Sequence, residues 1–275
     1  MVLLGIFSLQ LGAAFAKDLF DLVSPTGMVW LRMATAALVL GLVARPVLRG
    51  RTRTDWQVAI AFGVTLGVMN WSIYQSMSRI PLGIAVTIEF IGPLALAVVL
   101  SRRRRDLLWV LLAGAGVLLL GVQPGEVTLP GVLFALLAAA AWVGYILLSA
   151  RTGTRWPGLD GLAVAAVVAA LLLAPFAIVG SGSGLLDPRL LALGAAVGLL
   201  SSVIPYSCEL VALRTIRADV FSVLMSLEPA AAALAAMLVL GEFLTAWQWV
   251  ALVCVVVASV GATRSGQVIT DPVPD

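Results

Sequence analysis

Two acidic residues lie inside long apolar stretches of the chain, and each is close to a proline. Glu89 lies four residues before Pro93, and Glu228 lies directly before Pro229. A charge at the centre of a bilayer costs about 2.5–3.5 kcal/mol on insertion scales, so an acid there is a candidate functional residue. A proline inside a helix leaves the carbonyl four residues earlier without its hydrogen bond, which for Pro93 is the carbonyl of Glu89. We therefore expect two intramembrane carboxylates, each beside a helix break.

Each of these carboxylates has a functional and a structural interpretation. In the functional interpretation, Glu89 binds the ammonium group of a substrate or exchanges a proton, and Glu228 exchanges a proton. In the structural interpretation, Glu89 hydrogen-bonds a neighbouring helix and Glu228 orients the break at Pro229. We predict Glu89 as a substrate-binding residue, and both acids as proton-coupling residues, because an ionisable group inside a membrane is usually retained for function.

One basic residue, Arg32, also lies inside an apolar stretch. Its guanidinium group is suited to bind a substrate carboxylate through two parallel hydrogen bonds. Two other interpretations remain open: Arg32 pairs with Glu89, or its long side chain extends to the membrane surface.

Polar and aromatic side chains elsewhere in the apolar stretches complete the predicted substrate site. Asn70 and Tyr74 are four residues apart, so on a helix they share one face. Such a face suits a cavity wall, although hydrogen bonds between helices, worth about 0.6 kcal/mol each on average in membranes, would also explain it. Trp142 and Tyr145 are further candidates, with Trp142 interpreted mainly as a packing residue. The predicted substrate-binding residues besides Glu89 and Arg32 are Gln10, Asn70, Trp71, Tyr74 and Tyr206.

The sequence lacks the residues that several kinds of chemistry require. The chain has no histidine, which is the commonest general base and metal ligand. It has no phosphate-binding loop of the GxxxxGKS or GxxxxGKT kind. Its two cysteines, Cys208 and Cys254, are too few and too far apart for a usual zinc site. We therefore expect no metal, no cofactor and no enzymatic activity.

The composition indicates an integral membrane protein. The chain is 61% hydrophobic and 11% charged, whereas soluble domains are about half apolar and about a quarter charged. A span needs about 20 apolar residues, so the chain has room for ten with short loops. The predicted fold is all-α, with ten transmembrane helices at Val2–Phe20, Gly27–Ala44, Trp56–Met77, Ile84–Leu100, Leu107–Val122, Leu129–Ser149, Leu159–Gly180, Arg189–Val211, Ala218–Leu240 and Thr245–Thr263.

The basic residues indicate the orientation. Thirteen of the 17 Lys and Arg residues fall in the even-numbered loops and the C-terminal tail, and three fall in the odd-numbered loops. Because cytoplasmic loops carry the excess of positive charge, both termini are expected in the cytoplasm of a bacterial cell, with the chain in its inner membrane. The run Arg102–Arg105 is interpreted as a topology anchor, with a lipid-headgroup patch as the alternative. The net charge of +3 is thus a topology signal, and we expect no nucleic-acid partner.

An internal repeat divides the chain into two halves. An offset of 136 residues aligns Ile80 with Ile216 and Pro93 with Pro229. Each half also carries a GxxxG pair, Gly63 with Gly67 and Gly194 with Gly198, which favours close helix packing. Because five spans are an odd number, the second half must enter the membrane from the opposite side, as in many secondary transporters. We predict one five-helix repeat over 1–125, a second over 126–265, and a short tail over 266–275.

The chain resembles the EamA branch of the drug/metabolite transporter superfamily, and within it the bacterial threonine/homoserine exporters of the inner membrane. The resemblance covers nearly the whole chain, and its fourth-span and ninth-span motifs are specific. It implies two inverted five-helix halves that export small amino acids, with proton coupling as an extension. The matching stretches are Pro81–Val86 with Glu89-Phe90 and Gly92–Ala95, Pro205–Ser207 with Glu209, Leu224–Ala230, and Leu240–Glu242 with Leu244-Thr245.

We therefore expect a proton-coupled secondary exporter of small neutral amino acids, most specifically threonine and homoserine. The expected partners are the amino acid and the lipid bilayer, and a homodimer is left open. A multidrug or other metabolite exporter of the same fold is the alternative, with Trp71, Tyr74 and Tyr206 as a cage for a cation. A non-transporting membrane scaffold is the alternative of another class. The absence of histidine and of long loops disfavours a lipid-modifying enzyme.

Overall fold

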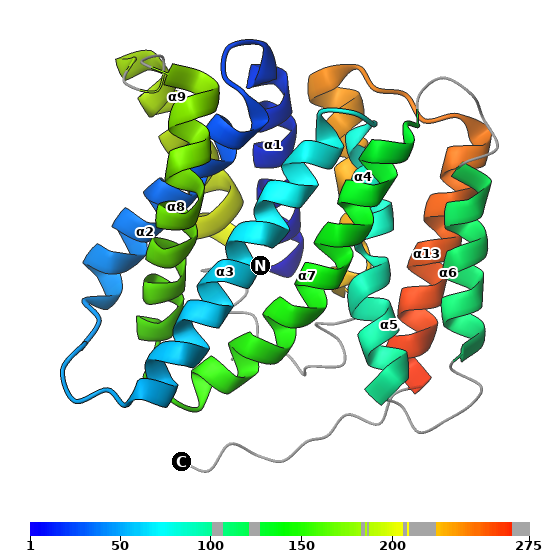
Figure 1. Cartoon of the computed structure of the whole chain (residues 1–275). Coiled ribbons are helices and arrows are strands. Elements are labelled where there is room, and N and C mark those ends of the chain that lie inside the picture. Colours follow the sequence, from blue (N-terminus) through cyan, green and yellow to red (C-terminus); the bar gives the residue numbers. More distant parts are fainter. Residues whose placement is uncertain are drawn as a thin grey trace.

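The computed structural model describes residues 1–100, 107–120, 127–182, 185, 187–205, 208 and 224–265, and within these residues it contains helices and loops but no strand. Figure 1 shows the helices side by side in one bundle. The described helices are α1 (Val2–Asp18), the 3-10 turn η1 (Leu19–Asp21), α2 (Pro25–Ala44), α3 (Arg53–Met77), α4 (Leu82–Glu89), α5 (Ile91–Leu100), α6 (Leu107–Leu120), α7 (Leu129–Gly153), α8 (Asp160–Ser181), α9 (Pro188–Gly198), the π-helical turn η4 (Leu199–Val203), α12 (Glu228–Ala235), the π-helical turn η5 (Ala236–Leu240) and α13 (Ala246–Ser265).

Seven helical segments in the described part of the chain are long and apolar enough to cross a membrane, and three more are apolar but shorter. The expectation of an all-helical, multi-pass membrane protein is therefore confirmed. The three shorter segments belong to the predicted fifth, eighth and ninth spans, each of which extends beyond the described residues. The seven long segments are Val2–Asp21, Pro25–Ala44, Arg53–Met77, Leu82–Leu100, Leu129–Gly153, Asp160–Ser181 and Ala246–Arg264, and the shorter ones are Leu107–Val117, Pro188–Val203 and Glu228–Leu240.

Local sequence signals explain where the long helices begin. Ser24 and Thr128 each precede a helix with proline in its first turn, and each side chain accepts a hydrogen bond from the backbone three residues on. Thr52 and Asp55 form a reciprocal capping box at the start of α3. Such caps satisfy backbone N–H groups that have no partner within the helix, and each is typically worth about 1 kcal/mol.

The two prolines beside the acids both lie in the first turn of a helix. The predicted fourth span is divided into α4, which ends at Glu89, and α5, which begins at Ile91 and contains Pro93. Pro229 is the second residue of α12. A proline in the first turn of a helix removes no hydrogen bond, because the N–H groups there have no helical partner.

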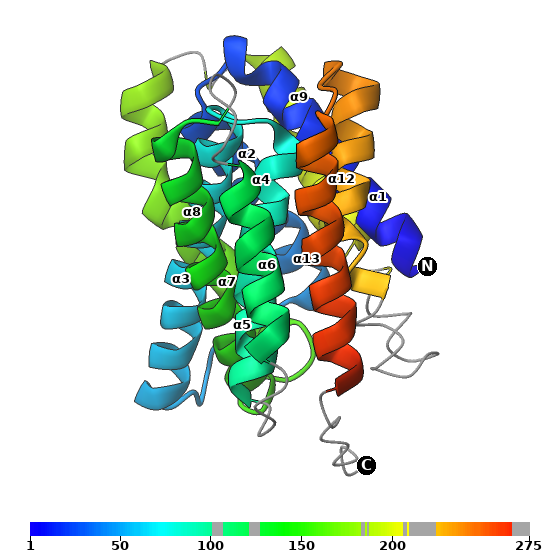
Figure 2. The same ribbon diagram turned by 90° about the vertical axis from the view of Figure 1, so that its right-hand side faces the viewer.

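Helices from before and after residue 125 contact one another throughout the bundle. α3 lies against α7 and α8, α4 against α7 and α12, and α6 against α13. Figure 2 shows α6 and α13 side by side on one flank of the bundle. Close contact requires glycine at Gly92, where an added Cβ would lie 2.1 Å from the carbonyl oxygen of Ala139 on α7.

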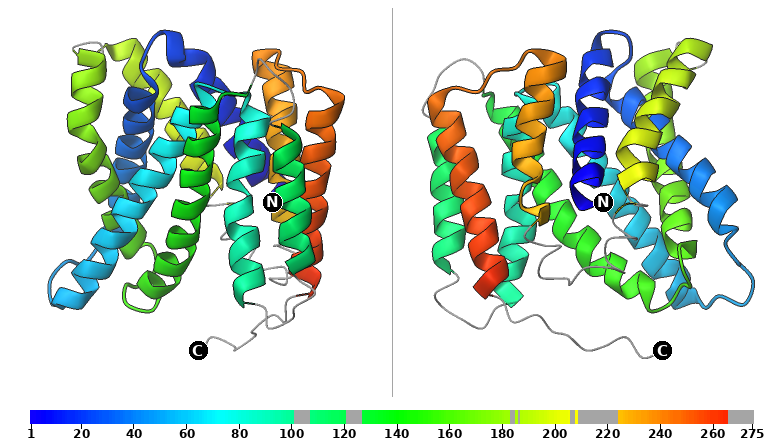
Figure 3. Two further views of the ribbon diagram at one scale, coloured as in Figure 1. Left: turned by 45° about the vertical axis from the view of Figure 1, so that its right-hand side comes forward. Right: turned by 180° about the vertical axis from the view of Figure 1, so that it is seen from behind.

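The loops that connect the helices fall into two groups, one at each end of the bundle. The α2–α3 and α7–α8 connections lie at one end, and η1 and the α3–α4 connection lie at the other (Figures 1 and 3). At the second end, Lys17 forms an ion pair with Glu242 and donates to the carbonyl of Ile80 over 2.9 Å. Glu242 also accepts from the backbone N–H of Leu82 over 2.8 Å, so it caps α4 from a loop 160 residues away. This group of contacts, the Lys17–Glu242 clip, joins α1, α4 and the loop before α13.

Candidate functional site

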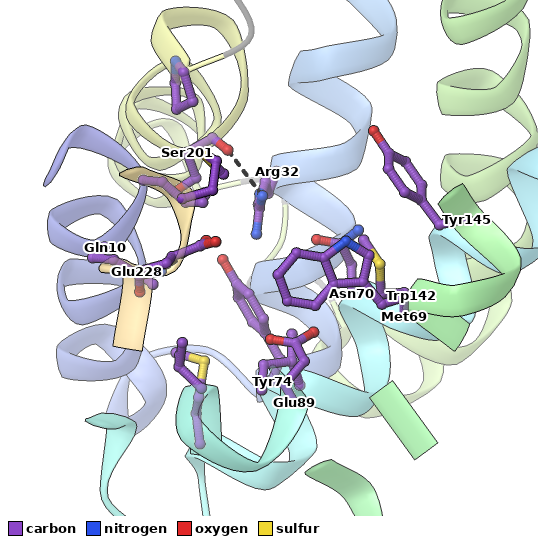
Figure 4. Close-up of a pocket in the computed structure, with 17 residues that line it drawn as sticks. Gln10, Arg32, Met69, Asn70, Tyr74, Glu89, Trp142, Tyr145, Ser201 and Glu228 are labelled. Atoms are coloured by element: carbon purple, nitrogen blue, oxygen red, sulfur yellow. Dashed lines mark hydrogen bonds between the residues drawn. The ribbon is translucent and has the colours of Figure 1, made fainter. Parts of the chain in front are cut away.

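A cavity of about 180 Å³ lies between α1, α2, α3, α4, α7 and α12, and we call it the central cavity. Figure 4 shows its lining side chains converging on one space. Apolar side chains, including Met69, Met77 and Met225, make up the rest of its wall. The polar or charged residues that line it are Gln10, Arg32, Asn70, Tyr74, Glu89, Tyr145, Ser201 and Glu228.

Three buried ionisable side chains face this cavity. Glu89, Glu228 and Arg32 are 9%, 4% and 7% exposed. Glu228 has the same charge as Glu89 when both are ionised, and Arg32 has the opposite charge. In the described part of the chain, the Glu89 carboxylate forms no hydrogen bond and no ion pair. The direct Arg32–Glu89 pair that the sequence left open is therefore not formed, and Arg32 does not extend to the surface.

Arg32 instead contacts the π-helical turn η4. One terminal nitrogen, Nη2, donates to the backbone carbonyl of Ser201 over 2.9 Å, and Nε donates to Ser202 Oγ over 3.3 Å. The guanidinium carbon also lies 5.8 Å from the centre of the Tyr74 ring. Ser8 of α1 donates in the same way to the carbonyl of Leu200 over 2.8 Å. The irregular backbone of η4 is thus held by side chains, as burial in a membrane protein requires.

Several polar atoms on the cavity wall have no hydrogen-bond partner in the described part of the chain. They are the Tyr74 hydroxyl, the Ser201 hydroxyl and the side-chain oxygen of Gln10. The amide nitrogen of Gln10 donates to Glu228 Oε1 over 3.1 Å. Leaving a buried polar group unpaired costs about 1–3 kcal/mol, so this wall favours a ligand that supplies the missing hydrogen bonds.

Similarity to known proteins identifies the family. Residues 129–264 match the EamA-like transporter family. Over 267 residues, 96% of this chain and 90% of the relative, the sequence is 41% identical to the threonine/homoserine exporter RhtA of Salmonella typhimurium and to that of Escherichia coli K12. The chain belongs to the EamA-like transporter family. This membership confirms the resemblance seen in the sequence and the expectation of a transporter rather than an enzyme.

Two more distant similarities agree with this family membership. An uncharacterized transporter of Bacillus subtilis, YwfM, is 29% identical over 158 residues, which are 56% of this chain and 53% of that one. A crystal structure of another protein, 21% identical in sequence, superposes with a TM-score of 0.63 and covers 96% of each chain. At this identity the superposition shows a shared fold alone.

Within this EamA-like transporter, most of the predicted site residues meet at the central cavity. Gln10, Arg32, Asn70, Tyr74 and Glu89 all line it, as does the predicted proton-coupling residue Glu228. Asn70 and Tyr74 lie one turn apart on α3, as their spacing predicts, and Asn70 donates to the carbonyl of Leu66 in its own helix. Tyr206 lies outside the described residues.

Trp71, also predicted to bind substrate, points away from the central cavity. It does not line the central cavity; its indole nitrogen donates to Thr26 over 3.1 Å, and its ring meets Phe134 edge-on at 5.4 Å. A helix rotates by about 100° per residue, so a side chain directly after Asn70 points away from the face that Asn70 and Tyr74 share. The helical spacing in the sequence therefore already places Trp71 off the face that Asn70 and Tyr74 share.

Other lining residues were underestimated or missed. Trp142, interpreted from sequence mainly as a packing residue, lines the cavity, and Tyr145 does so one turn later. The methionines of the wall were not predicted, because a methionine in an apolar helix carries no signal of its own. Their unbranched thioether side chains adapt to ligands of different shape. Among the described residues, no group of three or more Cys, Asp or Glu side chains is arranged to hold a metal ion.

Proposed function

We propose that this chain is a secondary-active exporter of small neutral amino acids, with threonine and homoserine as its substrates. The observation that carries the proposal is the central cavity, in which buried groups of both charges and unpaired hydroxyl groups surround one small space. A zwitterionic amino acid with a hydroxyl side chain complements each of these groups. The names of the threonine/homoserine exporters, which are 41% identical over almost the whole chain, support the same substrates.

Each end of the zwitterion has a binding partner in this proposal. The N–H groups of Arg32 that are not bonded to η4 bind the substrate carboxylate. The Glu89 carboxylate binds the ammonium group, which replaces the water lost on burial. The Tyr74 hydroxyl pairs with the side-chain hydroxyl of threonine or homoserine. An analogue without this hydroxyl would leave the buried Tyr74 hydroxyl unpaired, so the site should reject it.

Proton coupling follows from the two acids. Glu89 and Glu228 face one cavity and carry like negative charges, so loss of the substrate ammonium from Glu89 favours uptake of a proton there or on Glu228. Export then exchanges an amino acid leaving the cell for protons entering it. Alternating exposure of the cavity to the two sides of the membrane completes the cycle.

In the membrane, we propose ten spans in two inverted repeats, 1–125 and 126–265, followed by the tail 266–275. The seven long and three shorter apolar helices support ten spans. The connections α2–α3 and α7–α8, both predicted to be cytoplasmic, lie at one end of the bundle, which supports cytoplasmic termini in the bacterial inner membrane.

A multidrug exporter is disfavoured by the size and the wall of the cavity. Drug-sized ligands usually occupy about 300–1,000 Å³, and the central cavity has about 180 Å³. The aromatic cage that the sequence suggested requires Trp71, which contacts Thr26 and Phe134 instead.

Transport by the purified protein in proteoliposomes tests the proposal. We expect threonine counterflow by the wild type, and threonine flux driven by a pH gradient that falls at least tenfold in Glu89→Gln. Asp18→Asn is the matched control, because it makes the same carboxylate-to-amide change at an exposed position. Unchanged pH-driven flux in Glu89→Gln would remove Glu89 from the mechanism, and no counterflow of threonine or homoserine by the wild type would refute the proposed substrates.

A further inference from the structure

A second cavity of about 250 Å³ lies beside the central cavity, between α5, α7 and α13. Its wall is mainly apolar and includes Pro93, Ala97 and Ile146, together with residues of α13. Neither the family resemblance nor the proposed binding of a small zwitterion assigns a role to this space. It is the larger of the two cavities, and it is of a kind that takes an apolar group.

Three side chains line both cavities: Trp142, Met225 and Glu228. The two spaces are therefore neighbours that share one partition. Met225 is a flexible thioether that yields readily to a ligand, and Glu228 is held from one side by Gln10. Trp142 is the bulky, rigid member of the three.

Trp142 is held in its place by an aromatic contact. Its ring meets Phe90 edge-on, with centroids 5.4 Å apart and planes at 82°. Phe90 itself lines the second cavity and lies in the break between α4 and α5. Figure 4 shows the indole of Trp142 reaching into the central cavity beside Asn70. The indole thus occupies space that would otherwise join the two cavities.

We propose that Trp142 sets the upper size limit of the substrate by separating the central cavity from the second cavity. The inference rests on the proposed function, because it takes an amino acid whose charged end is held by Arg32 and Glu89. With the indole in place, the side chain of the substrate must fit the central cavity. Without the indole, a large apolar side chain of the substrate, such as that of leucine or phenylalanine, extends into the second cavity and is removed from water.

Competition for threonine counterflow tests this role. In Trp142→Ala we expect the potency of phenylalanine relative to unlabelled threonine to rise at least tenfold over the wild type. Trp142→Leu, which keeps an apolar side chain at this position, provides an intermediate change and a second readout if the alanine variant folds poorly. Trp247→Ala is the matched control, because Trp247 is 58% exposed and lines neither cavity.

Refilling the second cavity provides the decisive comparison. Adding Ala97→Phe to Trp142→Ala places a ring in the space that phenylalanine would use, so the gain should be lost in the double variant. If threonine is exchanged but the relative potency of phenylalanine does not rise in Trp142→Ala or Trp142→Leu, the size-limit role is refuted and the proposed function stands. If Trp247→Ala gives the same gain as Trp142→Ala, the role is refuted too. If the wild type does not exchange threonine, the proposed function itself fails.

Discussion

Replacing Gly63 with alanine should destabilise the protein, whereas the same replacement one turn later, at Gly67, should not. The two glycines form the GxxxG pair of α3 and face α8. A Cβ added at Gly63 would lie 2.6 Å from the carbonyl oxygen of Ala165 and 2.5 Å from Cβ of Val168. A Cβ added at Gly67 would meet its nearest atom, a terminal methyl of Leu172, at 3.3 Å.

The size of the effect follows from these distances. Ordinary contacts begin at 3.4 Å, so α3 and α8 would have to separate by roughly 0.8–0.9 Å to admit a Cβ at Gly63. Overpacking of this kind typically costs about 1–3 kcal/mol. At Gly67 the nearest atom is the end of a flexible leucine side chain, which can move aside, and at both positions alanine is favoured over glycine in a helix by about 0.8–1.0 kcal/mol. Because this helix preference is common to both positions, it cancels, and the two variants should differ in unfolding free energy by the overpacking cost of about 1–3 kcal/mol.

Thermal unfolding of the purified variants in one detergent measures this difference. About 2–4 °C per kcal/mol is usual for chains near this size, so we expect the midpoint of Gly63→Ala to lie roughly 2–12 °C below that of Gly67→Ala. Because α3 carries Asn70 and Tyr74, threonine counterflow should also fall in Gly63→Ala. Equal midpoints, or a lower midpoint for Gly67→Ala, would show that Gly63 does not set the distance between α3 and α8.

Two further predictions concern contacts between the halves of the chain. In the Lys17–Glu242 clip, a double-mutant cycle of Lys17→Met and Glu242→Gln should give a coupling free energy of about 1–3 kcal/mol, because both charges are partly buried and Glu242 also caps α4. A coupling free energy under about 0.5 kcal/mol would mean that the clip behaves like an exposed ion pair. Arg32→Met should weaken threonine binding at least tenfold, or about 1.4 kcal/mol. Arg32→Lys should not restore binding, because an ammonium group cannot reproduce the planar contacts to η4. Wild-type affinity for threonine in either variant, measured by calorimetry, would contradict the role of Arg32 in binding the substrate carboxylate.

Local sequence determined the helical character of the protein and much of the site. A chain with so little charge and such long apolar stretches has to form helices in a bilayer, since each backbone polar group there needs an internal partner. The cost of burying a charge singled out Glu89, Glu228 and Arg32, and all three line the central cavity. Helical spacing alone predicted that Asn70 and Tyr74 share a face.

Tertiary structure decided which of these residues meet, and on which side of each helix. Arg32 contacts the backbone of Ser201, which is 169 residues away and has no local signature. Trp71 and Trp142 are equally aromatic in sequence, yet the first is directed to Thr26 and the second into the cavity. The physical reason is that apolar helices in lipid have no strong hydrophobic preference for one face. Close packing at glycines and a few buried hydrogen bonds set their rotation, and those partners come from distant parts of the chain.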